Sequence, residues 1–196
     1  MNPALLLASI SKHLSLTPEE TQFFTSLLRS KHIAKNQFLL REGDICKYQS
    51  FVTKGCLKTY YLDETGIEHI IDFSIEEWWA DDLYSLLTQK PSSYNIKAIE
   101  DTDILQIGKA ELELLYQKVP KFERFFRIIT ENSLVASQQR MIDSLSLTAE
   151  ERYNNFCRRY PTLIYNLPKK QIASYIGVSA EFFSRMQHKM LLRDKK

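Results

Sequence analysis

Apolar residues recur at helical spacing over the first 30 positions of the chain, so residues 3–30 predict helix. A helix start is expected at Thr17. Its hydroxyl can cap backbone amides, Pro18 suits a first helical position, and two acids follow in the first turn. The apolar positions are Leu5, Leu6, Ile10, Leu14, Phe23, Phe24, Leu27 and Leu28.

The pattern changes at about Ile33, where short runs rich in β-branched and aromatic residues begin, separated by turn-like stretches. Short strands at this spacing predict a barrel or a sandwich. The chain has only five glycines, and four of them fall between candidate elements, so we expect a positive φ at Gly43, Gly55, Gly66 and Gly108. The predicted strands are 38–40, 50–52, 56–62, 67–73, 95–99 and 104–107.

After Gly108 the spacing of apolar residues returns to that of helices. Residues 109–118 predict a short helix that stops before Pro120. Residues 121–147 contain no Gly or Pro and predict an amphipathic helix of about six or seven turns. Thr148 with Glu151 three residues later forms a capping box, so another helix begins there and runs to Tyr160.

The segment 167–186 has the spacing of a helix-turn-helix. Ala173 is small where two helices must cross closely, Gly177 can adopt the left-handed conformation of a tight turn, and Ser179 can cap the second helix. An ordinary helical hairpin with a glycine turn is the alternative. The apolar residues that would pack the pair onto a third helix are Ile172, Ile176, Val178, Phe183 and Met186.

The other face of the second helix carries side chains that suit base edges. A glutamate can accept from cytosine N4, and an arginine can bind guanine O6 and N7. These residues are Ser179, Ala180, Glu181, Ser184, Arg185 and His188.

Charge is distributed unevenly along the chain. The whole chain carries +2, but residues 167–196 hold seven basic and two acidic side chains, a net charge of +5. The rest of the chain therefore carries −3. A basic end on a neutral-to-acidic body indicates either a polyanion partner or a solvated charged tail.

The segment 177–185, Gly-Val-Ser-Ala-Glu-Phe-Phe-Ser-Arg, resembles the Glu-x-x-Ser-Arg recognition helix of Crp/Fnr transcription regulators. Residues 148–153 and 167–175 are similar to a compact subgroup of that family. The resemblance implies a cyclic-nucleotide-binding-like β-roll, a homodimer built on the long helix, and operator binding by paired recognition helices. It implies base contacts by Glu181, Ser184 and Arg185. Ala180 stands where family members often carry arginine, so one contact is missing.

The resemblance also identifies the sequence positions that would contact an effector in the roll. Members that bind a cyclic nucleotide place Gly-Glu before a short helix and Arg-Ser or Arg-Thr before the next strand. Here those positions read Ala80-Asp81 and Ser92-Ser93, so the arginine is replaced by a hydroxyl. Trp79 can stack on a flat ligand, although adjacent tryptophans are more often core and surface-covering residues. The candidate effector pocket is Trp79, Asp81, Ser92 and Ser93, the effector is unknown, and cyclic AMP is not expected.

Other sensing or catalytic chemistry has little support in the sequence. Three dispersed cysteines, Cys46, Cys56 and Cys157, fall short of the four or so that an iron–sulfur cluster needs and argue against a disulfide framework. His69 on a strand is a conceivable haem ligand, but a satisfied strand histidine is the commoner case. No cofactor, metal site or catalytic residue is predicted, and the chain is not expected to be an enzyme. The cysteine usage and the lack of a bilayer-length apolar run indicate a cytoplasmic protein.

The predicted architecture is α+β. Residues 1–118 form a sensor β-roll (a double-stranded β-helix, jelly-roll-like) with flanking helices, 119–147 the dimerisation helix, and 148–196 the helix-turn-helix domain.

The expected partners are double-stranded DNA, a second copy of the chain and, as a further candidate, RNA polymerase. No membrane partner is expected. The alternative is a ligand- or protein-binding module whose helix-turn-helix does not function. The dimer contacts expected are Phe126, Ile129, Leu134 and Met141. The DNA contacts expected are Lys169, Lys170, Gln171, Ser179, Glu181, Ser184, Arg185, His188 and Lys189.

Overall fold

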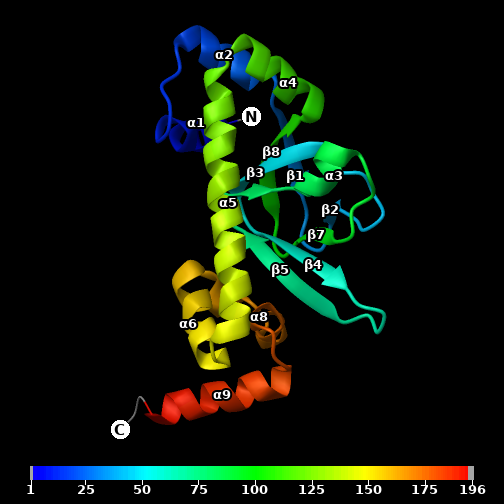
Figure 1. The fold of residues 1–196 in the computed structure, drawn as a ribbon, viewed down its shortest axis with the longest axis vertical. Coiled ribbons are helices and arrows are strands. Elements are labelled where there is room, and N and C mark those ends of the chain that lie inside the picture. Colours follow the sequence, from blue (N-terminus) through cyan, green and yellow to red (C-terminus); the bar gives the residue numbers. More distant parts are fainter. Residues whose placement is uncertain (1, 194–196) are drawn as a thin grey trace. The chain divides into compact units, whose positions relative to one another are not determined.

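The computed structural model describes residues 2–193, which form two compact units. The first contains residues up to 61 together with 71–131, and the second contains 62–70 together with the chain from 132 onward. In Figure 1 the first unit is mainly strands with helices around them, and the second is mainly helices. Asp194, Lys195 and Lys196, which contribute to the predicted basic segment, lie outside the described residues. Among the described helices, none is both long and apolar enough to cross a bilayer.

Two sheets, each of four strands within the described chain, make up the roll. In the first sheet the order is β1-β8-β3-β6, and both neighbours of β8 run antiparallel to it. In the second the order is β2-β7-β4-β5. The strands of the first sheet are β1 (Arg29–Ile33), β3 (Tyr48–Lys54), β6 (Trp79–Ala80) and β8 (Thr102–Gly108). Those of the second are β2 (Phe38–Leu40), β4 (Leu57–Leu62), β5 (Glu68–Ser74) and β7 (Asn95–Ala98).

Helices of the first unit cover the first sheet through one apolar cluster. Phe51 and Leu105 of the sheet pack there with Phe122 and Phe125 of the long helix, and all four are buried. The expected cap at Thr17 is present and is a full capping box: the Thr17 hydroxyl accepts from the Glu20 amide, and the Glu20 carboxylate accepts from the Thr17 amide. The helices in this cluster are α1 (Ala4–Ser11), α2 (Pro18–Ser26), α4 (Lys109–Lys118) and the first turns of α5 (Lys121–Ser146), whereas α3 (Leu83–Thr88) packs its Leu86 into the second cluster, which fills the roll.

The prediction of helix over residues 3–30 is wrong at its end. Residues 29–33 form β1, which pairs with β8 over its whole length, from Arg29 opposite Gln106 to Ile33 opposite Thr102. This strand buries Ile33 alone, so its own apolar pattern is weak. Its conformation is set by pairing with a distant strand rather than by local spacing.

The expectation of positive φ holds at three of the four glycines and is wrong at Gly108. Gly43, Gly55 and Gly66 have φ values of 87°, 89° and 79°. Gly108 has φ −82° and is the extended residue before α4. A Cβ there would meet the Glu111 carboxylate, which is the movable end of a side chain, and would lie 3.4 Å from the Tyr48 ring, so no backbone constraint at this position requires glycine.

The second unit is built from the C-terminal half of α5 and four shorter helices. The capping box predicted at Thr148 with Glu151 is present and starts α6. Its interior is rich in aromatic rings; Phe156, for example, lies 5.2 Å from Tyr160 and 5.1 Å from Tyr175 between centroids. The helices are α6 (Ala149–Arg159), α7 (Leu163–Asn166), α8 (Lys169–Ile176) and α9 (Ala180–Arg193); α7 was not predicted.

Candidate nucleic-acid interface and sensor cavity

The turn between α8 and α9 has the predicted helix-turn-helix geometry. Gly177 ends α8 in the left-handed conformation, with φ 73° and ψ 43°. The amide of Val178 donates to the Ala173 carbonyl at 3.0 Å, which closes the turn. Ser179 then caps α9, since its hydroxyl accepts from the Phe182 amide at 3.1 Å. The local sequence therefore sets the direction in which α9 leaves the turn.

An apolar platform holds this helix pair on α6. Ala173 and Phe183 are buried, and the Phe183 ring lies 5.2 Å from that of Tyr153 on α6. Arg152 strengthens the join, because its guanidinium donates to the Ile176 carbonyl at 2.8 Å and to the Leu147 carbonyl at 2.6 Å. These carbonyls lie at helix ends, where the backbone lacks intrahelical partners. The buried platform residues of the pair are Ile172, Ala173, Ile176, Phe183 and Met186.

The face of α9 opposite this platform is polar and exposed to solvent. Glu181 lies in the first turn, where hydrogen bonds from its own amide and from the Ser179 hydroxyl lower the pKa of its carboxyl; the charge of Arg185 adds to this. Glu181 is therefore an acceptor at neutral pH, and Arg185 offers a fork of donors from the next turn. The exposed residues of this set are Ser179, Glu181, Ser184, Arg185, His188 and Lys189.

The remaining predicted DNA contacts lie at the start of α8. Lys169 and Lys170 are its first two residues and are exposed. Gln171 is half-buried, and its Oε1 has no hydrogen-bond partner among the atoms described. Cations and a polar amide at a helix N-terminus can meet phosphate oxygens. The structure therefore brings all nine predicted DNA contacts into the second unit.

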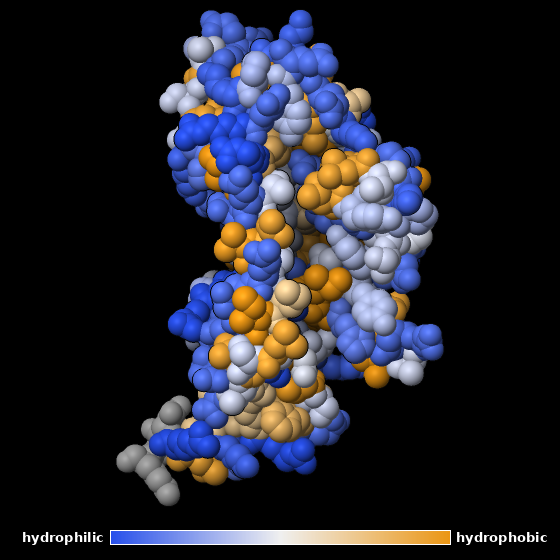
Figure 2. All heavy atoms as spheres, in the orientation of Figure 1, coloured by the Kyte–Doolittle hydropathy of each residue, from blue (hydrophilic) through white to orange (hydrophobic). Residues whose placement is uncertain are grey.

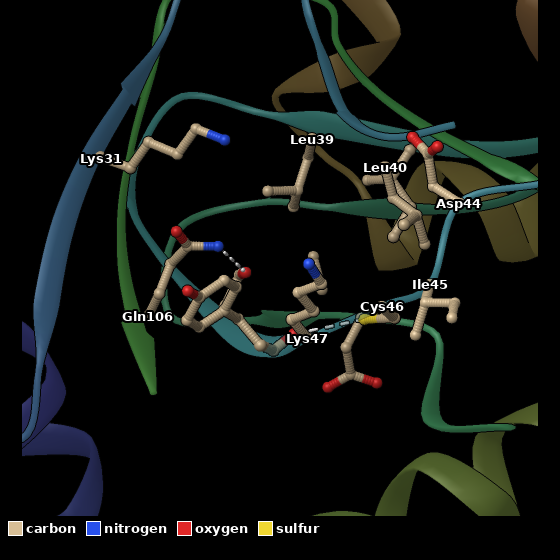
Figure 3. A pocket seen from close by; sticks show the side chains of 13 residues that line it. Lys31, Leu39, Leu40, Asp44, Ile45, Cys46, Lys47 and Gln106 are labelled. Carbon is tan, nitrogen blue, oxygen red and sulfur yellow. Dashed lines mark hydrogen bonds between the residues drawn. The ribbon is translucent and has the colours of Figure 1, made fainter. Parts of the chain in front are cut away.

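A cavity of about 310 Å³ opens into the roll of the first unit (Figure 3). Residues from both sheets and from the β2–β3 connection line it. Its polar groups include two lysines, two aspartates, a serine and a glutamine. The lining residues are Lys31, Leu39, Leu40, Asp44, Ile45, Cys46, Lys47, Tyr48, Ser50, Ala80, Asp81, Ile96 and Gln106.

Comparisons with known proteins agree with both parts of this arrangement. A model of the cyclic nucleotide-binding domain matches residues 30–119. The chain is 26% identical over 194 residues to the transcriptional activator protein Anr of Pseudomonas aeruginosa, covering 92% of this chain and 78% of that protein. It is 28% identical over 173 residues to the anaerobic regulatory protein of Haemophilus influenzae, covering 81% and 65%. The chain belongs to the Crp/Fnr family of transcription regulators.

Solved structures show that this Crp/Fnr regulator shares its fold with distant proteins. FixK2 from Bradyrhizobium japonicum superimposes with a TM-score of 0.72 at 19% identity, covering 85% of this chain and 86% of that one. The c-di-GMP-responsive regulator CLP from Xanthomonas campestris gives 0.73 at 12% identity, covering 91% and 93%. The predicted α+β class and family are therefore confirmed.

The four residues predicted for an effector pocket do not gather in one place in this Crp/Fnr regulator. Asp81 is the one of the four that lines the described cavity. The Trp79 ring lies in the apolar cluster, 5.4 Å from Phe51 and 5.5 Å from Phe126 between centroids. The other two positions, 92 and 93, lie on the loop before β7.

That loop is closed by its own hydrogen bonds. The hydroxyl of Ser92 donates to the Tyr94 carbonyl at 3.0 Å, and its backbone pairs with Gly43 and Asp44 at 2.8 Å each. Ser93 is exposed. The Tyr94 hydroxyl donates to the Asp81 carbonyl at 3.2 Å. The loop therefore ties itself to the adjacent turn and to the start of α3.

Sequence reasoning did not single out most of the residues that line the cavity. Lys31, Ser50 and Gln106 come from three strands that are distant in the sequence, and Cys46 from a connection. One signal was available: polar residues on positions that face the inside of the roll. It can be used only when the strand register is known.

The dimer contacts expected on α5 divide into three kinds: exposed, half-buried and buried. Leu134 and Met141 are 57% and 61% exposed, and Figure 2 shows apolar side chains gathered along this half of the helix. Ile129 is half-buried against the apolar cluster of the first unit. Phe126 is a correction: it is 5% exposed within one chain, so it belongs to the core and has little surface left for a partner. The other exposed apolar residues of this half are Val135, Ile142 and Leu145.

Proposed function

We propose that this Crp/Fnr regulator binds specific double-stranded DNA as a homodimer, with one α9 in each of two successive major grooves. The observation that carries the proposal is the two-sided character of α9. Phe183 and Met186 are buried on one side, whereas Glu181 and Arg185 are exposed on the other. A helix held in this way can enter a groove without disturbing its own packing.

The side chains on the exposed face support separate roles in recognition. Arg185 is suited to a bidentate contact with guanine O6 and N7, and Glu181 to accepting from cytosine N4. Ser184 can donate to either a base or a phosphate. Lys169, Lys170 and Lys189 supply positive charge for phosphates, which fixes the register of the protein on the duplex without carrying sequence information.

Dimerisation is proposed from the apolar surface on α5. Leu134 and Met141 are seven residues apart, which is one heptad, and both are exposed in the single chain. A parallel pair of helices would bury both seams symmetrically. A relative that is named as a transcriptional activator, Anr, also favours RNA polymerase as a partner.

The roll is proposed to respond to an effector other than cyclic AMP. The arginine that holds a cyclic phosphate in family members is replaced by Ser92, whose hydroxyl is already bonded to Tyr94. A hydroxyl lacks the charge-assisted fork that offsets desolvation of the phosphate. Titration calorimetry with cyclic AMP and cyclic GMP is expected to show at most millimolar affinity, and micromolar binding of either would contradict the proposal.

Selection of bound sequences from a random DNA pool tests the proposal as a whole. The expected product is a pair of inverted half-sites whose centres lie about one helical turn apart, or a multiple of it. Gel shifts on the selected site should then persist at salt concentrations that release random DNA. The alternative function, a ligand- or protein-binding module with an idle helix-turn-helix, predicts weak retention of every sequence and complete loss with salt.

A further inference from the structure

The inside of the roll changes from apolar to polar along its strands. Val52 and Ile104 are paired across β3 and β8, and both are buried in the cluster that fills the roll. Two residues further along each strand, Ser50 and Gln106 are paired in the same way. Because side chains on a strand alternate between faces, these residues point to the same side as Val52 and Ile104.

The polar pair is buried where an apolar pair would stabilise the roll more. Ser50 is 1% exposed and Gln106 is 7% exposed, and the Gln106 amide donates to the Ser50 hydroxyl at 3.0 Å. On the adjacent strand β1, Lys31 stands two residues before the buried Ile33. Buried polar groups lose hydration that protein partners only partly replace. Two buried polar groups next to an apolar interior, with the exposed Lys31 also lining the cavity, indicate a site for a polar ligand.

Opposite charges stand on different walls of the cavity at this end. Figure 3 shows Lys31 and Asp44 on opposite sides, with Leu39 and Leu40 between them. A ligand of one charge would satisfy one wall and be repelled by the other. The walls therefore match a molecule that carries both charges and a short apolar body.

A second carboxyl makes the cation-binding side stronger. Asp81 lines the cavity next to Asp82, and the side chain of Gln49 donates to it. Burial, followed by the charge of Asp82, raises the pKa of Asp81 to about 6. A bound ammonium group would offset both effects, since it supplies the opposite charge within the cavity.

We propose that this cavity is the effector site and that it binds a small zwitterion, with the carboxylate toward Lys31 and the ammonium toward Asp44 and Asp81. The proposal deepens the effector role assigned to the roll above and rests on it. The volume of about 310 Å³ is enough for a small molecule, and the opposite charges of the lining are what select a zwitterion.

Calorimetry on the full chain without DNA tests the charge requirement, with 6-aminohexanoate as the probe. Hexanoate and hexylamine are its matched controls, because each keeps the apolar chain and lacks one charge. We expect 6-aminohexanoate to bind at least about tenfold more tightly than either control, a difference of about 1.4 kcal/mol. Equal binding of all three compounds, or no heat from 6-aminohexanoate, 4-aminobutyrate or glycine at millimolar concentration, would overturn the proposal.

Two substitutions assign the charges to walls of the cavity. Lys31→Met should reduce the affinity for 6-aminohexanoate to that for hexylamine, and Asp81→Asn should reduce it to that for hexanoate. Lys35→Met, at an exposed lysine outside the cavity lining, is the control and should change nothing. Retained selectivity in both cavity variants would also overturn the proposal.

Two further measurements keep this test separate from that of the proposed function. Circular dichroism and binding to the selected DNA establish that each variant is folded. A chain that binds its DNA site but no zwitterion contradicts the ligand assignment alone. A chain that binds 6-aminohexanoate but no specific DNA contradicts the DNA-binding function alone.

Discussion

Helix α9 and the roll use polar residues in opposite ways. On α9, Glu181 and Arg185 are exposed, and the apolar residues behind them hold the helix. In the roll, Ser50 and Gln106 are polar but buried, and the cavity lies in front of them. Exposed side chains lose little hydration until a large, highly charged partner arrives. Buried ones have already lost it, which favours a small ligand that matches them closely.

Leu134→Asp in α5 is expected to give the largest effect and to separate the two regions. A charge in the apolar seam would prevent pairing of the helices, and one α9 alone would have to bind one half-site. We expect a monomer with at least about 100-fold weaker binding to a two-half-site DNA, while 6-aminohexanoate binding by the roll is unchanged. Sedimentation and gel shift measure the two outcomes.

The control for this variant is Ser133→Asp, which adds the same charge at the neighbouring exposed position. It should remain a dimer and bind DNA as the parent does. A parent chain that sediments as a monomer at micromolar concentration would contradict the dimer proposal.

The helix-turn-helix was predictable from sequence because its determinants are local. Ala173, Gly177 and Ser179 lie within one short segment, and each has one conformational or packing role that the structure reproduces. The same holds for the caps at Thr17 and Thr148. Capping and turn residues act on amides only a few positions away, so they can be read without knowing the fold.

The cavity was not predictable because its residues meet through strand register. Gln106 reaches Ser50 only when β8 pairs with β3, and Lys31 joins them in the cavity lining only when β1 pairs with β8. The strand β1 itself was missed for the same reason. The family motif instead placed the effector contacts at residues 92 and 93, which lie on a loop. A motif gives the positions that contact a ligand in other family members, whereas the cavity of this chain is lined by other residues.

Asp81→Asn is expected to change how the stability of the roll depends on pH. The pKa of Asp81 is raised from its ordinary value of 3.8 to about 6, so the folded chain binds this proton more tightly than the unfolded chain. Stability contributed by the protonated carboxyl is therefore present below about pH 4 and is lost as the pH rises through about 6. The loss is of order 3 kcal/mol.

The neutral amide lacks this titration, so Asp81→Asn should gain stability over the parent at about pH 7 and gain much less at about pH 4. Urea unfolding at the two pH values measures the difference, with Glu76→Gln at an exposed site as the control. An equal effect of Asp81→Asn at both values would show that its carboxyl is not perturbed in the folded chain. This effect should leave DNA specificity untouched.

Gly177→Ala is expected to give a smaller effect, confined to the helix-turn-helix. No atom lies within 4 Å of a Cβ at this position, so the penalty comes from the positive φ of 73° alone. We expect a loss of about 1–2 kcal/mol in unfolding free energy for alanine. Gly177→Asn should lose less, since asparagine tolerates the left-handed region. Thermal unfolding compares the two, and equal losses would contradict the role given to the turn.

The most direct test of the account is a base-by-base affinity profile of Arg185→Ala and Lys189→Ala on the selected DNA site. The account predicts that Arg185→Ala loses about 1–3 kcal/mol per half-site and relaxes the preference at one base pair. Lys189→Ala should weaken all sequences alike and reduce the salt slope by about one unit. Uniform loss across sequences for Arg185→Ala would contradict the central claim that the exposed face of α9 reads bases.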